Sequence, residues 1–243
     1  MKIKIINPNT TQYMTDNIEM CGRKAAAIGT EVYAVSPETG PSSLECYVDE
    51  ALAVPGVLTE IVKGDSEENV DAYIIACFGD PGLHAAKEIT NKPVVGIAEA
   101  GIAVAKMISP NFSIITVLDR SVETVNDMVH MHGAQKFCRS IRSTGLGVLE
   151  FDKDKERGLE ALRYQSELAI KEDGAECILL GCAGFTGFVE DLRNQLGVPI
   201  YDGVAPAVKM AEALYGLNAS ISKVKTWSKP EKKEYRGFSF LEG

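Results

Sequence analysis

The stretch DAYIIACFG, residues 71–79, decides the fold class. Its apolar, partly β-branched run lacks the polar alternation of a half-exposed strand, which is typical of a parallel strand buried on both faces. The run ends at Cys77, and a glycine follows two residues later. A second stretch, AECILLGCAG at residues 175–184, ends in the same way at Cys182. Two buried strands that each end at a cysteine therefore predict a repeated α/β unit.

Outward from these stretches, short β-branched runs alternate with longer helical ones. This alternation predicts parallel sheets of the doubly wound type. Asp80 is expected to cap a helix whose first residue is Pro81. The expected strands cover residues 2–6, 31–36, 72–77, 93–97, 112–118, 140–149, 177–181 and 199–201. The expected helices cover residues 13–27, 47–62, 81–89, 122–132, 158–172, 188–196 and 205–217, with one more starting over 102–107.

An internal repeat organises these elements. Cys77 and Cys182 lie 105 positions apart (182 − 77), and PVVG at 93–96 aligns with PIYD at 199–202 at nearly the same offset. We therefore expect two pseudo-symmetric α/β lobes, each a parallel sheet flanked by helices, with the active site in the cleft between them. The first lobe would comprise residues 1–99 plus 205–243, and the second residues 100–204.

Composition excludes several classes of protein. The 243 residues are 45% hydrophobic and 24% charged, with a formal net charge of −9. This acidity argues against nucleic-acid and anionic-membrane partners, both of which require basic surfaces. No stretch approaches the roughly 18 apolar residues of a membrane span, and the N-terminal apolar run is too short for a signal peptide. We expect a cytoplasmic protein, and the apolar stretch 102–107 suggests a homo-oligomer.

Six cysteines and three histidines limit the available chemistry. A long chain without a secretion signal is expected to keep its thiols reduced. Three histidines leave little material for a histidine metal site or a Ser-His-Asp triad. The expected cofactor is none, and the expected metal is none.

The paired cysteines are the candidate catalytic residues. Ligands of open parallel sheets bind beyond the carboxyl ends of the strands, where Cys77 and Cys182 both lie. A following helix N-terminus would lower the thiol pKa toward neutrality. If the lobes face each other, one cysteine can remove a proton from carbon while the other delivers a proton to the opposite face. Such a site would invert a stereocentre in a small-molecule substrate.

At these residues the sequence resembles the hydantoin racemase family of the aspartate/glutamate racemase superfamily, with allantoin racemases as close relatives. Four motifs in order carry the resemblance: INPNT at 6–10, ACFGDPG at 76–82, GIAEA at 96–100 and GCAG at 181–184. The resemblance implies cofactor-independent racemisation at C5 of a 5-monosubstituted hydantoin, with Cys77 and Cys182 as the two acid/base thiols. It also implies that backbone N–H groups of Phe78, Gly79, Ala183 and Gly184 bind the ring carbonyls and stabilise the enolate.

Three further positions are candidates for substrate binding. Asn7 follows the first strand and is either a ring contact or a turn residue before Pro8. Ser43 lies in the loop after the second strand, from which it could reach the cleft. Thr116 is the counterpart of the Asn7 region in the second lobe.

Other functions stay open from the residues alone. Allantoin racemase would use the same site with a ureido substituent at C5. Free-amino-acid racemases of the superfamily carry Cys-Asn-Thr and Cys-Thr-His, whereas this chain has Cys77-Phe78-Gly79 and Cys182-Ala183-Gly184, which favour a neutral heterocycle. A binding protein with two α/β lobes but no catalysis is the alternative from another class.

Overall fold

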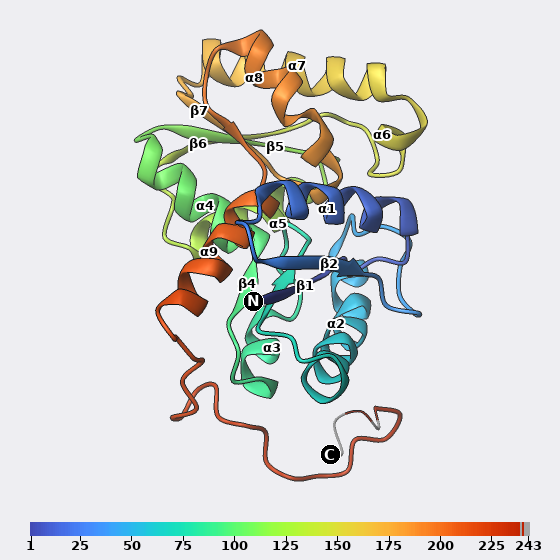
Figure 1. Cartoon of the computed structure of the whole chain (residues 1–243). Coiled ribbons are helices and arrows are strands. Elements are labelled where there is room, and N and C mark those ends of the chain that lie inside the picture. The colour runs from blue at the N-terminus through green and yellow to red at the C-terminus, as the bar shows by residue number, and fades with distance from the viewer. Residues whose placement is uncertain (239, 241–243) are drawn as a thin grey trace.

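The computed structural model describes residues 1–238 and 240, and it contains two four-stranded parallel sheets (Figure 1). The first sheet has the order β2-β1-β3-β4 and the second β6-β5-β7-β8, so the two halves of the chain share one topology. The strands are β1 Lys2–Ile6, β2 Glu31–Val35, β3 Ala72–Ile75, β4 Val94–Gly96, β5 Phe112–Thr116, β6 Cys138–Ser143, β7 Cys177–Leu180 and β8 Ile200–Tyr201. The expected fold class and repeat are confirmed.

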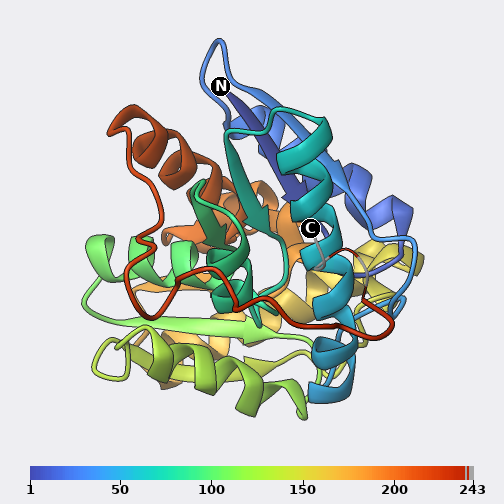
Figure 2. The same cartoon turned by 90° about the horizontal axis from the view of Figure 1, so that it is seen from below.

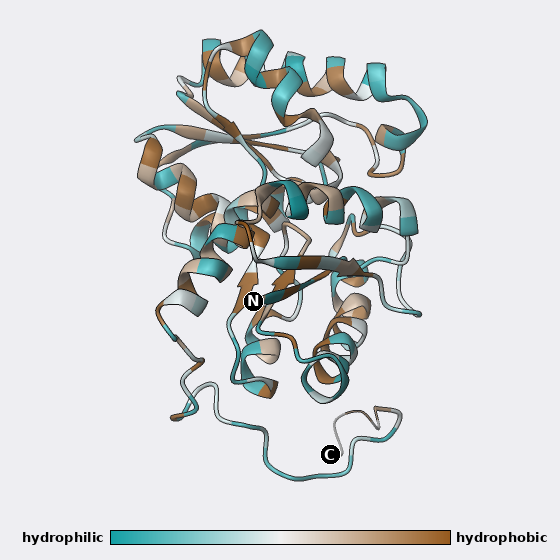
Figure 3. Cartoon of the chain, viewed as in Figure 1, coloured by the Kyte–Doolittle hydropathy of each residue, from teal (hydrophilic) through white to brown (hydrophobic). Residues whose placement is uncertain are grey.

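Helices cover both faces of each sheet. In the first half they are α1 Gln12–Ala25, α2 Tyr47–Glu67, α3 Leu83–Ile89 and α4 Ile97–Ile108. In the second half they are α5 Ser121–Met131, α6 Glu150–Lys153, α7 Lys155–Glu172, the 3₁₀ helix η1 Ala183–Phe188, α8 Val189–Leu196 and α9 Val204–Gly216. In Figure 3, α7 and α8 are banded teal and brown, as expected of helices with one face in a core and one in solvent.

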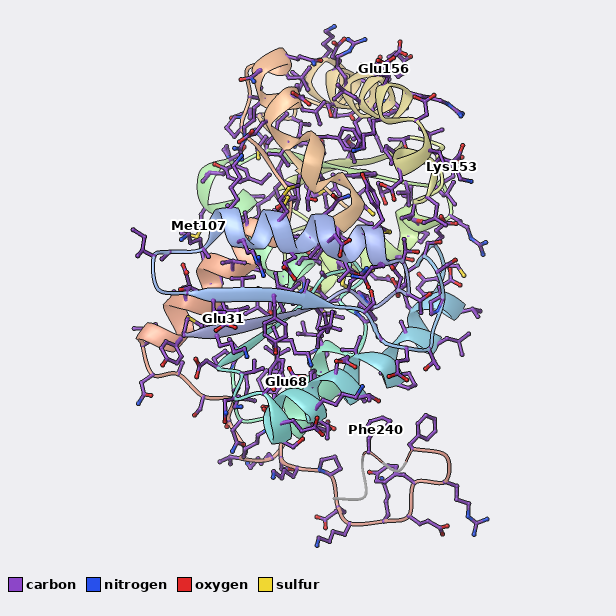
Figure 4. The ribbon with its side chains drawn as sticks, turned by 45° about the vertical axis from the view of Figure 1, so that its right-hand side comes forward. Glu31, Glu68, Met107, Lys153, Glu156 and Phe240 are labelled. Carbon is purple, nitrogen blue, oxygen red and sulfur yellow. The ribbon has the colours of Figure 1, made fainter. Side chains whose placement is uncertain are left out.

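Helix α4 belongs to two cores at once. Ile97 and Ala100 pack with α9 against the first sheet, whereas Ile102 and Ala105 pack against the second. The apolar character of residues 102–107 is therefore explained by packing between the two sheets; only its end, Met107, is strongly exposed (Figure 4). The expected homo-oligomer and the expected lobe boundaries stay predictions.

Several expected elements are wrong at their ends. The strand expected over residues 140–149, for example, is β6 Cys138–Ser143. The helix expected from Pro81 begins at Leu83, with Gly82 as its N-cap at φ 74°. Asp80 lies in the left-handed region at φ 44°, so the chain makes an extra turn before the helix starts. Ile97, expected in a strand, is the first residue of α4.

A buried charge fixes the first strand against α2. The Lys4 ammonium is fully buried, lies 2.9 Å from the Glu60 carboxylate and also pairs with Glu68 at the end of α2 (Figure 4). Buried charges are tolerated when they are paired and hydrogen-bonded. Lys4 therefore aligns β1, and with it the residues that follow the strand.

The chain after α9 runs along the outside of the first sheet's helices and passes α3 and α2 (Figure 2). The Lys223 ammonium donates to the carbonyls of Lys87 and Glu88 at 2.6 and 3.0 Å, and the Trp227 ring stacks on His84. Among the described residues, no helix is long and apolar enough to cross a membrane.

Candidate active site

Cys77 lies two residues beyond the end of β3. The Ala76 amide continues the sheet by donating to the Ile6 carbonyl at 2.8 Å, and the chain then turns away from it. The turn is closed by the Asp80 amide, which donates to the Cys77 carbonyl at 2.9 Å. The thiol is thereby held at the carboxyl edge of the first sheet, partly accessible to solvent.

Cys182 occupies the equivalent position in the second sheet. The Gly181 amide donates to the Ile115 carbonyl at 2.8 Å, as Ala76 does in the first sheet. A side chain at Gly181 would come within 2.8 Å of Ile114, so the strands approach closely just before the cysteine. Cys182 is the N-cap of η1 and is also partly accessible. Each thiol therefore stands two residues beyond the end of an inner strand of its sheet, β3 or β7.

The expected fall of the thiol pKa values is wrong. Burial raises the pKa of Cys77, and it raises the pKa of Cys182 to about 11. Backbone hydrogen bonds from Gly79 and Gly184 lower the two values, but they do not offset desolvation. The helix argument fails because α3 starts six residues after Cys77 and η1 is a single short 3₁₀ helix. Both thiols are consequently weak acids whose thiolates are strong bases.

Acidic side chains reinforce this shift. Glu50 and the Cys182 thiol raise the pKa of Cys77, and Glu45 with Asp152 raises that of Cys182. The effect of Cys182 on the pKa of Cys77 means that the two thiols are near enough to interact electrostatically. Sequence reasoning missed Glu45 and Glu50, because LECYVDE at 44–50 reads simply as the polar start of a helix.

The loop between β2 and α2 joins the two halves of the molecule. On one side, the Thr10 amide donates to the Pro41 carbonyl at 3.0 Å. On the other, the Val148 amide donates to the Glu45 carboxylate at 2.8 Å, and Ser121 donates to the Glu45 carbonyl. Ser43 lies half-buried between these two anchors. Its expected reach to the cleft and its contact with a substrate stay predictions.

Asn7 directly follows β1, and Thr116 ends the equivalent strand β5; both residues are buried. The Asn7 amide nitrogen donates to Asn9 at 3.0 Å and to Thr15 at 2.9 Å, so its donors are engaged inside the protein. This arrangement favours the turn-residue interpretation of Asn7. Thr116 is the last residue of β5, and its carbonyl accepts from the Thr144 amide at 3.0 Å.

The four expected backbone donors flank the two thiols. The Gly79 and Gly184 amides bond to the cysteine sulfurs. Within residues 1–238 and 240, no acceptor takes a hydrogen bond from the amides of Phe78 or Ala183. The Phe78 and Ala183 side chains are buried, so their backbones, not their side chains, border the site.

A buried acid, Asp80, stabilises the turn that follows Cys77. The Asp80 carboxylate accepts from the amides of Ala98 and Glu99 at the start of α4, so Asp80 caps α4 and not α3. Burial raises the pKa of Asp80 to about 7. The Nε2 atom of His132, the residue that caps the end of α5, lies 3.8 Å from this carboxylate, and burial lowers the His132 pKa. Asp80 is thus a structural residue that fixes the turn.

Comparisons with known proteins agree with this arrangement. The family model of the Asp/Glu/Hydantoin racemases matches residues 3–211. The chain belongs to this family. It is 53% identical over 237 residues to a hydantoin racemase of a Pseudomonas species, covering 98% of this chain and 95% of that one. It is 46% identical over 237 residues to a hydantoin racemase of Rhizobium meliloti, covering 98% of each.

Solved structures of the same family share the fold. The allantoin racemase from Klebsiella pneumoniae superposes with a TM-score of 0.96 at 41% identity, covering 99% of this chain and 98% of that one. Glutamate racemase from Francisella tularensis superposes with a TM-score of 0.67 at 14% identity, covering 100% and 94%, which shows the fold alone. The protein is an isomerase of the racemase type, so the alternative of a binding protein without catalysis is excluded.

Proposed function

We propose that the protein racemises 5-monosubstituted hydantoins at C5, with Cys77 and Cys182 as the two bases. The observation that carries this proposal is the equivalent position of the thiols, each two residues beyond the end of the same inner strand of its sheet, β3 or β7. The 53% identity to a hydantoin racemase supports the choice of substrate.

The reaction requires one proton removal and one proton delivery. The thiolate of one cysteine takes the C5 proton, and the electron pair of the C–H bond moves toward the neighbouring carbonyl to give an enolate. The thiol of the other cysteine then gives its proton to the opposite face of C5. Because the adjacent carbonyl acidifies C5–H, the proposal needs no metal and no cofactor.

The raised thiol pKa values suit this chemistry. A base removes a proton from carbon more effectively as its own pKa approaches that of the carbon acid. A thiol with a pKa of about 11 is a stronger base than an ordinary cysteine once it is ionised. The cost is that only about one thiol in ten thousand is ionised at pH 7.

The free backbone donors would stabilise the enolate. Phe78 and Ala183 amides without an acceptor among the described residues are available to the oxygens of a bound ring. Ser43 and Thr116 are proposed as further contacts to the ring. For Asn7, whose donors are engaged, we propose a role in shaping the turn that precedes α1.

Allantoin is the second candidate substrate. The TM-score of 0.96 with an allantoin racemase favours it, whereas the higher sequence identity favours a hydantoin with another substituent. Both molecules share the hydantoin ring, so the same thiols would act on each.

The test is proton exchange at C5. A single enantiomer of a 5-alkyl hydantoin, and separately (S)-allantoin, is incubated with the protein in D2O while optical rotation and the C5–H signal are followed. Rotation that decays to zero with deuterium entering C5 supports the proposal, and the faster compound identifies the substrate class. Spontaneous racemisation is subtracted with a protein-free control. If neither compound exchanges faster than this control, the assignment is wrong and glutamate and aspartate are tested next.

A further inference from the structure

A pocket of about 330 Å³ lies beside the turn that follows Cys77. It is formed by the start of α2, the turn itself and the end of α5. Its lining includes Tyr47, Glu50, Gly79, Asp80, His84 and Met131. Cys77 does not line this pocket, but Gly79, whose amide bonds to the Cys77 sulfur, does.

Glu50 lies directly over Gly79. A Cβ atom added at Gly79 would stand 1.9 Å from the nearer Glu50 carboxylate oxygen, so the acid could keep its present position only beside a glycine. Real Cβ contacts are never this short, and the carboxylate therefore occupies the space that any other residue at position 79 would fill. This contact places an acid next to the backbone that holds the Cys77 sulfur.

The surroundings of Glu50 favour proton exchange near neutral pH. Burial raises the pKa of Glu50 to about 7, and the negative charges of Asp127 on α5 and Asp49 on α2 add to the effect. Cys77 lies in the turn after β3, and the Glu50 charge raises its pKa. Among the described residues, no hydrogen-bond donor engages the Glu50 carboxylate. An acid without such a donor is free to gain and lose a proton.

We propose that Glu50 carries protons between the Cys77 thiol and solvent in this pocket, and so resets the site between turnovers. The proposal rests on the two-thiol function proposed above. After Cys77 has removed a proton from one enantiomer, Cys77 is protonated and Cys182 is ionised. A second molecule of the same enantiomer requires the opposite protonation state, with Cys77 ionised and Cys182 protonated.

The reset step balances as a simple proton transfer. The Cys77 S–H bond breaks with its electron pair left on sulfur, and an O–H bond forms on the Glu50 carboxylate, directly or through one water molecule. Glu50 then releases the proton to water in the pocket. Cys182 takes a proton from solvent on its own side. Glu50 acts through Cys77 and does not touch the substrate.

The experiment compares Glu50→Gln and Glu50→Ala with the wild type and with Glu67→Gln, an exposed acid on the same helix. Initial rates are measured from one enantiomer far from equilibrium. We expect kcat to fall by about tenfold or more in both Glu50 variants. We expect kcat/KM to fall much less, because the reset follows product release. Imidazole should raise kcat of Glu50→Ala, where it has space to replace the acid, and should leave the wild type unchanged.

Two results overturn the proposal. One is a kcat of the Glu50 variants equal to that of Glu67→Gln. The other is a reduced kcat that imidazole does not raise in folded Glu50→Ala, with folding checked by circular dichroism. Cys77→Ser is assayed in parallel: if it racemises at the wild-type rate, the two-thiol function itself fails. If Cys77→Ser is inactive and imidazole does not raise the kcat of Glu50→Ala, only the role proposed for Glu50 is wrong.

Discussion

The Asp80 carboxylate accepts a hydrogen bond from the Ala98 amide at 3.0 Å, and this contact ties the Cys77 turn to the N-terminus of α4. The fit is close, because a Cβ atom at Gly96 would lie 2.1 Å from the Asp80 carboxyl carbon. Since α4 packs in the cores of both sheets, the same contact relates the position of Cys77 to the second half of the molecule.

Asp80→Ala should therefore destabilise the protein. The change removes the acceptor for two amides at the start of α4, and loss of a helix cap costs about 0.5–2 kcal/mol. The free energy of unfolding is measured in urea. The matched control is Asp154→Ala, an exposed cap of α7 that accepts from the Arg157 amide. A loss no larger than that of the control would mean that Asp80 stabilises the protein no more than an exposed helix cap does.

The pH dependence of the reaction should follow the raised thiol pKa values. Because burial raises the pKa of Cys77 and brings that of Cys182 to about 11, the thiolate fraction grows with every pH unit above neutrality. We expect kcat/KM to rise about tenfold per unit between pH 7 and pH 9 if one ionisation limits it. The measurement uses one enantiomer with spontaneous racemisation subtracted. A plateau already reached at pH 6.5 would contradict the raised values.

Two glycines near the thiols should respond differently to alanine. At Gly79 the new methyl group would meet the Glu50 carboxylate at 1.9 Å, whereas at Gly184 it would meet the Cys182 sulfur at 3.6 Å, an ordinary contact distance. Overpacking costs about 1–3 kcal/mol where the neighbouring group cannot move away. We expect Gly79→Ala to lower the urea midpoint clearly and Gly184→Ala to leave it near the wild-type value. Equal midpoints for the two variants would show that Glu50 moves aside freely.

The stability of the fold should depend on pH through Glu50. Its pKa rises from 4.5 to about 7 on folding, so the folded protein binds this proton more tightly than the unfolded chain does. The resulting stabilisation is fully present below pH 4.5 and is lost as the pH rises through 7. The difference in unfolding free energy between wild type and Glu50→Gln should therefore shift against the wild type from pH 5 to pH 8. Glu67→Gln serves as the control, and a Glu50→Gln difference as flat as that of Glu67→Gln would refute the assignment.

The single tryptophan reports on the C-terminal tail. The Trp227 indole N–H donates to His84 at 3.3 Å, and the Lys87 ammonium lies 5.3 Å from the ring centre. Changing Lys223 to alanine removes its bonds to the end of α3, which should loosen the tail. We expect acrylamide to quench the Lys223→Ala fluorescence more strongly than the wild-type signal. The exposed Lys225→Ala variant is the control, and equal quenching in all three proteins would mean that Lys223 does not hold the tail.

The sequence by itself determined the repeated α/β units and the place of both cysteines. Local chemistry is sufficient for this, because a short continuous apolar run such as residues 72–75 indicates a buried strand, and the residues just beyond its end lie at the carboxyl edge. The resemblance carried by four short motifs added the family, which the comparisons confirm.

The tertiary structure alone decided the environment of those cysteines. The raised pKa values arise from desolvation by parts of the chain far apart in sequence, which no local motif encodes. In the same way, Asp80 reads as the cap of the helix that follows it, yet its carboxylate caps α4, 18 residues further on. Glu50 meets Gly79 only because α2 packs beside the turn after β3. Local sequence specifies elements and their ends, whereas charge, burial and contact between distant segments depend on how those elements pack.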